Sequence, residues 1–243
     1  MRRSIIKILR NAPYFRGRDR LLSSISATYR PKPLTINHGL QMILDPYEWL
    51  QQGIIAKGCT EPLTTKLIQR LLTPGDTFVD VGAHIGHHAL IGAREVGAAG
   101  RVIAIDPQPY NADRIGQNAL INDMSQIEIV PIAVSDSEGF ARFPFQIGRD
   151  RTRLAIGGSP MDTKVMFSCT VRRLENVLNE RELRQLDLLK IDVEGFEQQV
   201  LDGLGDWLGR CENIIFEQLQ RSGDQVIKTL QAAGFTLMTV EGK

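Results

Sequence analysis

A turn with two glycines follows a short apolar segment near residue 80. Residues 80–86 read DVGAHIG, which places an acid at the end of a predicted strand and a glycine-containing turn before a predicted helix. Glycine lets the backbone come close to a ligand, and the N-terminus of a helix offers free N–H groups to an anion. The sequence therefore predicts a ligand site at this turn.

The acid at the start of this turn indicates which kind of ligand is favoured. A dinucleotide-binding turn has the pattern Gly-x-Gly-x-x-Gly around a pyrophosphate, and Asp80 stands where its first glycine would be. A carboxylate there would repel a pyrophosphate but would suit a ligand with an ammonium group. The turn therefore favours S-adenosylmethionine over NAD.

Two further acids follow predicted strands. Asp106 comes after the apolar residues 102–105, roughly twenty residues beyond the glycine turn, where an acid can accept hydrogen bonds from both ribose hydroxyls. Asp192 follows the apolar residues 186–191, and ligands of an open parallel sheet bind outside the carboxyl ends of its strands. Asp192 could hold the sulfonium or amino group of the cofactor, orient an acceptor, or bind a metal together with Glu194. Glu194 also fits an acid at a helix N-terminus.

Three of the four histidines, His84, His87 and His88, cluster just after the glycine turn. An alcohol that attacks a methyl sulfonium must lose its proton, and histidine titrates near neutrality. We expect His84 to be the general base because it lies nearest the turn, with Asp192 as the alternative. If a helix begins near Ile85, His84 and His88 share one face, but the spacing does not demand a metal and none is predicted. The alternative for His87 and His88 is that they simply pack along the helix.

Strands and helices that must position these residues alternate along the chain. Apolar runs and periodicity predict strands at 78–81, 102–105, 127–134, 186–191, 214–216 and 235–240, and helices at 61–72, 89–96, 110–120, 197–201 and 226–233. This alternation predicts an α/β fold with a mostly parallel sheet covered on both faces. Residues 140–145 and 165–171 predict two further strands, which form a hairpin-like insertion between core strands.

Basic residues are concentrated at the N-terminus. Residues 1–30 hold eight basic residues and one acid, whereas the remaining chain holds 21 basic and 27 acidic residues. Ile5, Ile8 and Leu9 fall on one face at helical spacing, which predicts a short basic amphipathic helix. This helix would either pack on the rest of the protein or lie on an anionic membrane surface. Residues 34–37 and 40–44 flank His38-Gly39 and predict a short hairpin. We therefore divide the chain into a basic extension, 1–54, and a main domain, 55–243.

The composition is that of an ordinary globular protein. The 243 residues include 42% hydrophobic residues, 23% charged residues and three cysteines without a metal-binding or disulfide spacing. No apolar run approaches the roughly 20 residues that cross a bilayer. We expect a reduced, cytoplasmic protein, either free or peripheral to the inner face of the membrane. The sequence does not indicate an oligomeric state.

Three segments together carry a resemblance to a known family. Residues 80–86 (DVGAHIG), 133–136 (AVSD) and 190–197 (KIDVEGFE) occur in an order and spacing that resemble the FkbM-type methyltransferases over roughly residues 55–240. The resemblance implies a three-layer, Rossmann-like class I methyltransferase that uses S-adenosylmethionine. It also implies O-methylation of a hydroxyl on a sugar, a glycolipid or a related natural product.

The resemblance also implies roles for particular residues. It places Asp80, Gly82, Ala83 and Gly86 around the methionine part of the cofactor, Asp106 at the ribose, Ala133 and Val134 at the adenine, and Glu61 near the cofactor entrance. His84 departs from the family pattern, in which Asn is usual. The family also has one more antiparallel strand after residues 235–240, so we expect this domain to lack its last strand or the chain to be truncated.

Two other functions remain open at this point. One is a methyltransferase acting on RNA or another nucleic acid, although the acidic body lacks the basic excess of a nucleic-acid binder and an Asn-Pro-Pro-Tyr-like segment. The other is a cofactor-binding fold that serves as a non-catalytic interaction module. The expected partner is a small-molecule or glycan acceptor with a free hydroxyl, and nucleic acid is not expected.

Three arginines in the insertion, Arg149, Arg151 and Arg153, are expected to contact the acceptor. Replacing all three with alanine is predicted to raise the KM for the acceptor and to leave cofactor affinity nearly unchanged, because guanidinium groups bind phosphate or carboxylate bidentately. Steady-state kinetics with the true acceptor, together with a cofactor titration, measures both effects. Unchanged kinetics would mean that the arginines lie on a solvated loop.

Overall fold

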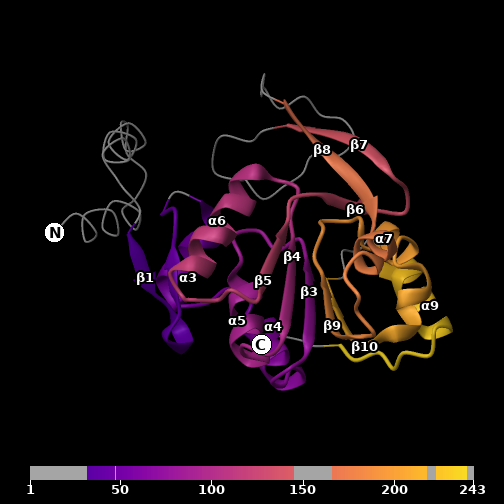
Figure 1. Cartoon of the computed structure of the whole chain (residues 1–243), viewed down its shortest axis with the longest axis horizontal. Coiled ribbons are helices and arrows are strands. Elements are labelled where there is room, and N and C mark those ends of the chain that lie inside the picture. The colour runs from indigo at the N-terminus through magenta and orange to yellow at the C-terminus, as the bar shows by residue number, and fades with distance from the viewer. Residues whose placement is uncertain (1–31, 47, 145–165, 218–222, 240–243) are drawn as a thin grey trace. The chain divides into compact units, whose positions relative to one another are not determined.

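Five apolar segments build a parallel central sheet. The computed structural model describes residues 32–46, 48–144, 166–217 and 223–239, and there the sheet has the strand order β10-β9-β3-β4-β5 (Figure 1). The strands are β3 (Thr77–Val81), β4 (Arg101–Ile105), β5 (Ile127–Val130), β9 (Leu186–Ile191) and β10 (Cys211–Phe216), and all their pairings are parallel. The chain moves outward from β3 to β5 and then returns to β9 on the other side of β3. The strand order therefore reverses between β3 and β9.

Helices cover both faces of this sheet, as predicted. The helices on one face are α4 (Pro62–Leu71), α5 (His87–Val96) and α6 (Pro109–Leu120), and those on the other are α7 (Leu174–Asn179), α8 (Glu197–Asp202) and α9 (Gly223–Ala232). Within β3, Phe78 belongs to the apolar cluster under α4–α6, whereas Val79 and Val81 belong to the cluster under α7–α9. Alternate residues of a strand point to opposite faces, so a strand buried on both faces is mostly apolar, and Asp80 is the buried exception in β3.

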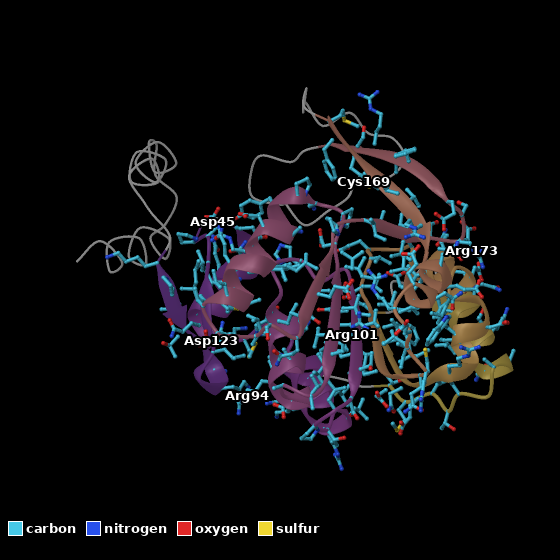
Figure 2. The ribbon with its side chains drawn as sticks, viewed as in Figure 1. Asp45, Arg94, Arg101, Asp123, Cys169 and Arg173 are labelled. Atoms are coloured by element: carbon cyan, nitrogen blue, oxygen red, sulfur yellow. The ribbon has the colours of Figure 1, made fainter. Side chains whose placement is uncertain are left out.

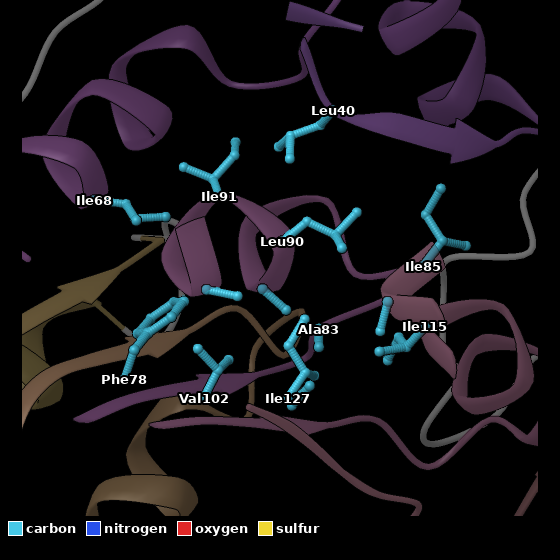
Figure 3. Close-up of a cluster of buried hydrophobic side chains, with 14 of the residues drawn as sticks. Leu40, Ile68, Phe78, Ala83, Ile85, Leu90, Ile91, Val102, Ile115 and Ile127 are labelled. Atoms are coloured by element: carbon cyan, nitrogen blue, oxygen red, sulfur yellow. The ribbon is translucent and has the colours of Figure 1, made fainter. Parts of the chain in front are cut away.

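The N-terminal hairpin covers the outer side of α5. Its strands β1 (Pro33–Thr35) and β2 (Gln41–Ile43) pair antiparallel, which confirms the hairpin. The prediction that His38 and Gly39 alone form the turn of this hairpin is wrong. A 3₁₀ turn at Asn37–Gly39 connects the strands, and the Ile36 N–H donates to the Leu40 carbonyl at 2.8 Å. Figure 3 shows Phe78 and Val102 on the sheet side of α5 and Leu40 on its other side.

Helix α3 (Trp49–Lys57) was missed by the sequence analysis. The apolar positions of this segment do not form a stripe at helical spacing, and Gly53 lies in its middle. The helix is defined by its ends instead. The Glu48 carboxylate accepts hydrogen bonds from the Leu50 and Gln51 N–H groups, and Gly58 ends the helix in a left-handed conformation.

A second sheet follows β5 in the chain. Its strands are β6 (Ala133–Ser135), β7 (Gly139–Pro144) and β8 (Met166–Arg173), in the order β6-β8-β7, and β7 pairs antiparallel with β8. The hairpin-like insertion between core strands is thus confirmed. The single strand predicted at 127–134 is wrong, because Pro131 lacks an N–H and the chain passes from β5 into the second sheet there. The three arginines of the insertion lie outside the described residues, as do residues 1–31.

The strand predicted at 235–240 is also wrong for residues 235–239, which the structure describes without a ladder partner. Phe235 and Leu237 are half-buried against the α7–α9 cluster, and the residues between and after them are exposed. Half-buried and exposed side chains therefore do alternate along residues 235–239, but the cause is packing of this segment against the α7–α9 cluster rather than pairing in a sheet. In the described part of the chain, the central sheet ends at β10.

Gly82 is required where the ends of β3 and β9 meet. It has a φ of +81°, and a Cβ there would lie 1.9 Å from the Asp192 carbonyl oxygen. Gly39 has a similar φ of +74° and nothing within 4 Å of an added Cβ, which makes it a matched control. Gly39→Ala is expected to cost about 1–2 kcal/mol of unfolding free energy from its backbone conformation. Gly82→Ala is expected to cost about 3 kcal/mol or more, because β9 must also move.

Urea denaturation of the two variants measures this difference. Equal losses for Gly82→Ala and Gly39→Ala would show that the approach of Asp192 to Gly82 does not constrain the fold.

Candidate cofactor and active site

A cavity of about 340 Å³ lies at the carboxyl ends of β3, β4 and β9. Its volume is within the range of small-molecule sites, about 300–1,000 Å³. The predicted site residues that line it are Gly82, His84, Asp106, Ala133, Val134 and Asp192. This is the end of the sheet at which the strand order reverses, where ligands of doubly wound folds bind. In the view of Figure 2, Cys169 on β8 lies above the central sheet, and Arg101 marks the amino end of β4.

Asp106 connects the glycine turn to the start of α6. Its Oδ2 accepts a hydrogen bond from the His84 N–H at 3.0 Å, and its Oδ1 accepts from the Gln108 N–H at 2.9 Å and from Asn111 Nδ2 at 3.0 Å. Burial raises the pKa of Asp106 to about 7, although these three donors oppose the shift. A carboxylate has about four acceptor positions, so this side chain can accept a further hydrogen bond from a ribose hydroxyl.

The wall of the cavity beyond Asp106 is mainly apolar. It is formed by Ile132, Ala133 and Val134 around β6, and by Ala141 and Phe143 of β7. An apolar wall next to a carboxylate fits a flat base attached to a ribose. The second sheet thus contributes to the same cavity as the glycine turn.

The glycine turn shapes the cavity, and several of its N–H groups are already bonded within the protein. The Gly82 and Ala83 N–H groups donate to the Ile105 carbonyl at 2.9 and 3.0 Å, and the Gly86 N–H donates to the Ala83 carbonyl at 2.9 Å. Gly82 lines the cavity, whereas Ala83 and Gly86 do not. Ala83 and Gly86 would therefore act on the cofactor site indirectly, by fixing the course of the backbone around the turn.

His84 lines the cavity from the turn between β3 and α5, with a left-handed φ of 51°. Burial lowers its pKa to about 4, while the Asp192 carboxylate opposes this shift and the Lys190 ammonium adds to it. The imidazole is therefore neutral above about pH 5 and can accept a proton.

His84 does not share a helical face with His88, because α5 begins at His87 rather than near Ile85. His87 and His88 are buried in the first turn of α5, and both ring nitrogens of His87 have no hydrogen-bond partner among the described residues. Neither lines the cavity. Within the described ranges, no group of three His, Cys, Asp or Glu side chains is arranged to hold a metal ion.

Asp80 is fully buried and does not line the cavity. Its neighbour in the register of β3 and β9 is Lys190, whose Nζ lies 3.4 Å from Asp80 Oδ1 and 3.0 Å from Asp192 Oδ2. Burial raises the pKa of Asp80, and the Lys190 ammonium opposes that shift. The cation beside Asp80 is thus the ammonium of Lys190, whereas the sequence alone predicts the ammonium of a ligand there.

Lys190 was missed as a site residue by the sequence analysis. The available signal was a basic residue in an otherwise apolar strand, two positions before Asp192. Glu61, at the start of α4, also does not line the cavity. Desolvation raises the pKa of Glu61, with Lys190 opposing the shift, so Glu61 belongs to the same group of interacting charges.

The order of the parallel strands and the site at their carboxyl ends define a class I methyltransferase, for which S-adenosylmethionine is the methyl donor. A family model described as "Methyltransferase FkbM domain" matches residues 80–237. The chain belongs to the FkbM methyltransferase family.

Similar proteins include several methyltransferases. Methyltransferase sdnD of Sordaria araneosa is 28% identical over 68% of this chain and 75% of its own length. The 31-O-demethyl-FK506 methyltransferase FkbM of Streptomyces tacrolimicus is 29% identical over 69% of this chain and 75% of its own length. The hexuronic acid methyltransferase AglP of Haloferax volcanii is 28% identical over 58% and 55%, respectively. A solved S-adenosylmethionine-dependent O-methyltransferase of Thermotoga maritima is a looser likeness, with a TM-score of 0.46 and 14% identity over 87% of this chain and 65% of that one.

The raised pKa of Asp106 predicts a pH-dependent affinity for the cofactor. A ribose hydroxyl that donates to Asp106 would favour its charged form, so binding below about pH 7 must release a proton. The affinity for S-adenosylmethionine is therefore expected to rise about tenfold from pH 6 to pH 8. Calorimetry across this pH range measures the effect.

The matched control is Asp106→Asn, which cannot ionise. This variant is expected to bind about ten- to a hundredfold more weakly at pH 8, in proportion to a lost hydrogen bond to a charged group, and to lose the pH dependence. A wild-type affinity that does not change with pH, or a slope that persists in Asp106→Asn, would contradict the placement of the ribose at Asp106.

Proposed function

We propose that this protein transfers a methyl group from S-adenosylmethionine to a hydroxyl oxygen of a sugar, a glycolipid or a related natural product. The observation that carries the proposal is the place of His84 on the wall of the cavity that Asp192 also lines, where burial lowers the pKa of the imidazole to about 4. A hydroxyl acceptor must lose a proton during methyl transfer, and a neutral imidazole can take it. Two of the similar proteins are named for 31-O-demethyl-FK506 and for hexuronic acid, which supports an oxygen acceptor.

The residues of the chain would divide the work of the site. Bound S-adenosylmethionine supplies a methyl group that is already activated by its sulfonium. Asp106 would hold the ribose, Ala133 and Val134 would contact the adenine, and Gly82 with Asp192 would lie at the methionine end. The protein must then align the acceptor oxygen with the methyl group and keep water out, and both tasks depend on fixed walls.

His84 would take the acceptor proton at a ring nitrogen. Because burial lowers its pKa to about 4, the neutral form that this step requires is present at neutral pH. The lowered pKa also makes the His84 imidazole a weaker base, which accepts the acceptor's proton less readily. Asp192 lines the same cavity and is the alternative proton acceptor.

The proposal is tested by methyl transfer from isotopically labelled S-adenosylmethionine to an extract of the source organism, with mass spectrometry of the product. A labelled small molecule or glycan that carries an O-methyl group supports it. Label in RNA, together with salt-dependent RNA binding, would instead favour a nucleic-acid methyltransferase. Cofactor binding without transfer to any component would favour a non-catalytic module.

His84→Asn tests the proton acceptor. We expect this variant to fold, to bind S-adenosylmethionine normally and to lose about 10²–10⁴-fold in kcat, the usual contribution of a general base. The wild-type kcat, measured at saturating S-adenosylmethionine, should hold from pH 8 down to about pH 5, since His84 protonates only near pH 4. Near-normal turnover in His84→Asn would exclude His84 as the base, and Asp192→Asn would then be the variant to measure.

A further inference from the structure

A buried lysine connects the interior of the sheet to the wall of the cavity. Lys190 and Asp80 are direct neighbours on the adjacent parallel strands β9 and β3, and their side chains are 4% and 1% exposed. Asp192, two residues after Lys190, has a side chain that is 25% exposed and lines the cavity. The ammonium of Lys190 lies 3.4 Å from Asp80 Oδ1 and 3.0 Å from Asp192 Oδ2, so it bridges a fully buried acid and an acid at the cavity.

The position of Asp192 is restrained at three places. Its N–H donates to the Val81 carbonyl at 3.0 Å. Its carbonyl oxygen lies so close to Gly82 that an added Cβ would come within 1.9 Å of it. Its carboxylate oxygen Oδ2 bonds to Lys190. The first two contacts fix the backbone, and the third fixes the direction of the carboxylate.

We propose that Lys190 is a positioning residue, which uses the buried charge of Asp80 as its counter-ion and holds the carboxylate of Asp192 toward the methionine end of the cofactor. The inference rests on the place of Asp192 in the proposed function. Asp80 makes the arrangement possible, because a lone buried ammonium would cost several kcal/mol of desolvation. Asp192 alone, with its partial exposure, would not keep the ammonium in the interior.

Further acidic groups lie near the ion pairs of Lys190 with Asp80 and Asp192, and they increase the need for a cation at this place. Glu61 from the start of α4 and Glu217 from the end of β10 both interact with Asp192. Burial and, to a smaller extent, the nearby acids together raise the pKa of Glu217 to about 7. His84 faces the same group and is neutral above about pH 5. Lys190 is therefore the cation that this group of acids shares, and without it Asp192 would be repelled by its neighbours.

The test separates a positioning role from a purely structural one. Lys190→Met removes the ammonium and leaves Asp80 as an unpaired buried acid, so the Tm is expected to fall by about 10 °C. Asp80→Asn/Lys190→Met removes both charges of the buried pair and is expected to recover at least half of that loss. A structural role predicts that cofactor binding recovers as well, whereas a positioning role predicts that it does not.

Binding is measured by calorimetry with two probes, S-adenosylmethionine and 5′-methylthioadenosine, which lacks the amino-acid part. In the double variant, we expect S-adenosylmethionine to bind at least about tenfold more weakly than in the wild type and 5′-methylthioadenosine to bind within about twofold. Recovery of S-adenosylmethionine affinity together with the Tm would overturn the proposal. An equal loss for both probes would overturn it too, because it would indicate general deformation of the cavity.

A second variant decides the question if the double variant does not fold. Asp192→Asn leaves the pair of Asp80 and Lys190 intact, and it should show the same selective loss of S-adenosylmethionine affinity with a Tm close to the wild type. An unchanged affinity ratio between the two probes would overturn the proposal. Because both probes report binding, a wild-type protein that binds them but transfers no methyl group would contradict the proposed function without deciding the role of Lys190.

Discussion

The parallel register between β3 and β9 determines how the glycine turn, Asp80, Lys190 and Asp192 lie relative to one another. In this register Asp80 stands beside Lys190 and Val81 beside Ile191, so the turn at Gly82 comes directly against Asp192. A side chain at Gly82 would push these two strand ends apart. Because the carboxyl ends of β3 and β9 meet at the reversal of strand order, the turn at Gly82 and the carboxylate of Asp192 line the same cavity.

The same register places opposite charges in the interior. A fully buried carboxylate is costly alone, and the ammonium on the neighbouring strand lowers that cost. The ammonium then reaches past the end of β9 to a carboxylate on the cavity wall. One network therefore both stabilises the centre of the sheet and sets the electrostatic surroundings of His84, whose imidazole is kept neutral by burial and by the nearby cation.

Much of the fold could be predicted because its signals are local. The strands β3, β4 and β9 are short apolar runs, and the glycine turn and Asp106 follow them at recognisable positions. The break between β5 and β6 also had a local signal in Pro131, but the apolar residues on both sides made one strand the simpler interpretation. Helix α3 gave little signal, since it depends on its capping residues and on packing rather than on an apolar stripe.

The charges of the site were harder to predict, because they depend on contacts between distant parts of the chain. The sequence places Lys190 110 positions after Asp80, and only the strand register makes them neighbours. For the same reason, the carboxylate of Asp80 could be interpreted as a ligand contact when its partner is a lysine. The lowered pKa of His84 likewise arises from burial, which its position after a glycine turn does not reveal.

We infer that the cavity at the ends of β3, β4 and β9 holds the methyl donor, with its adenosyl part at Asp106 and its amino-acid part at Asp192. A crystal structure of the wild-type protein with S-adenosyl-L-homocysteine tests it most directly. We expect the ribose within hydrogen-bond distance of Asp106, the adenine against Ala133 and Val134, and the amino-acid part at Asp192. Homocysteine density at a different edge of the sheet, or a reversed ligand with its adenine at Asp192, would contradict it.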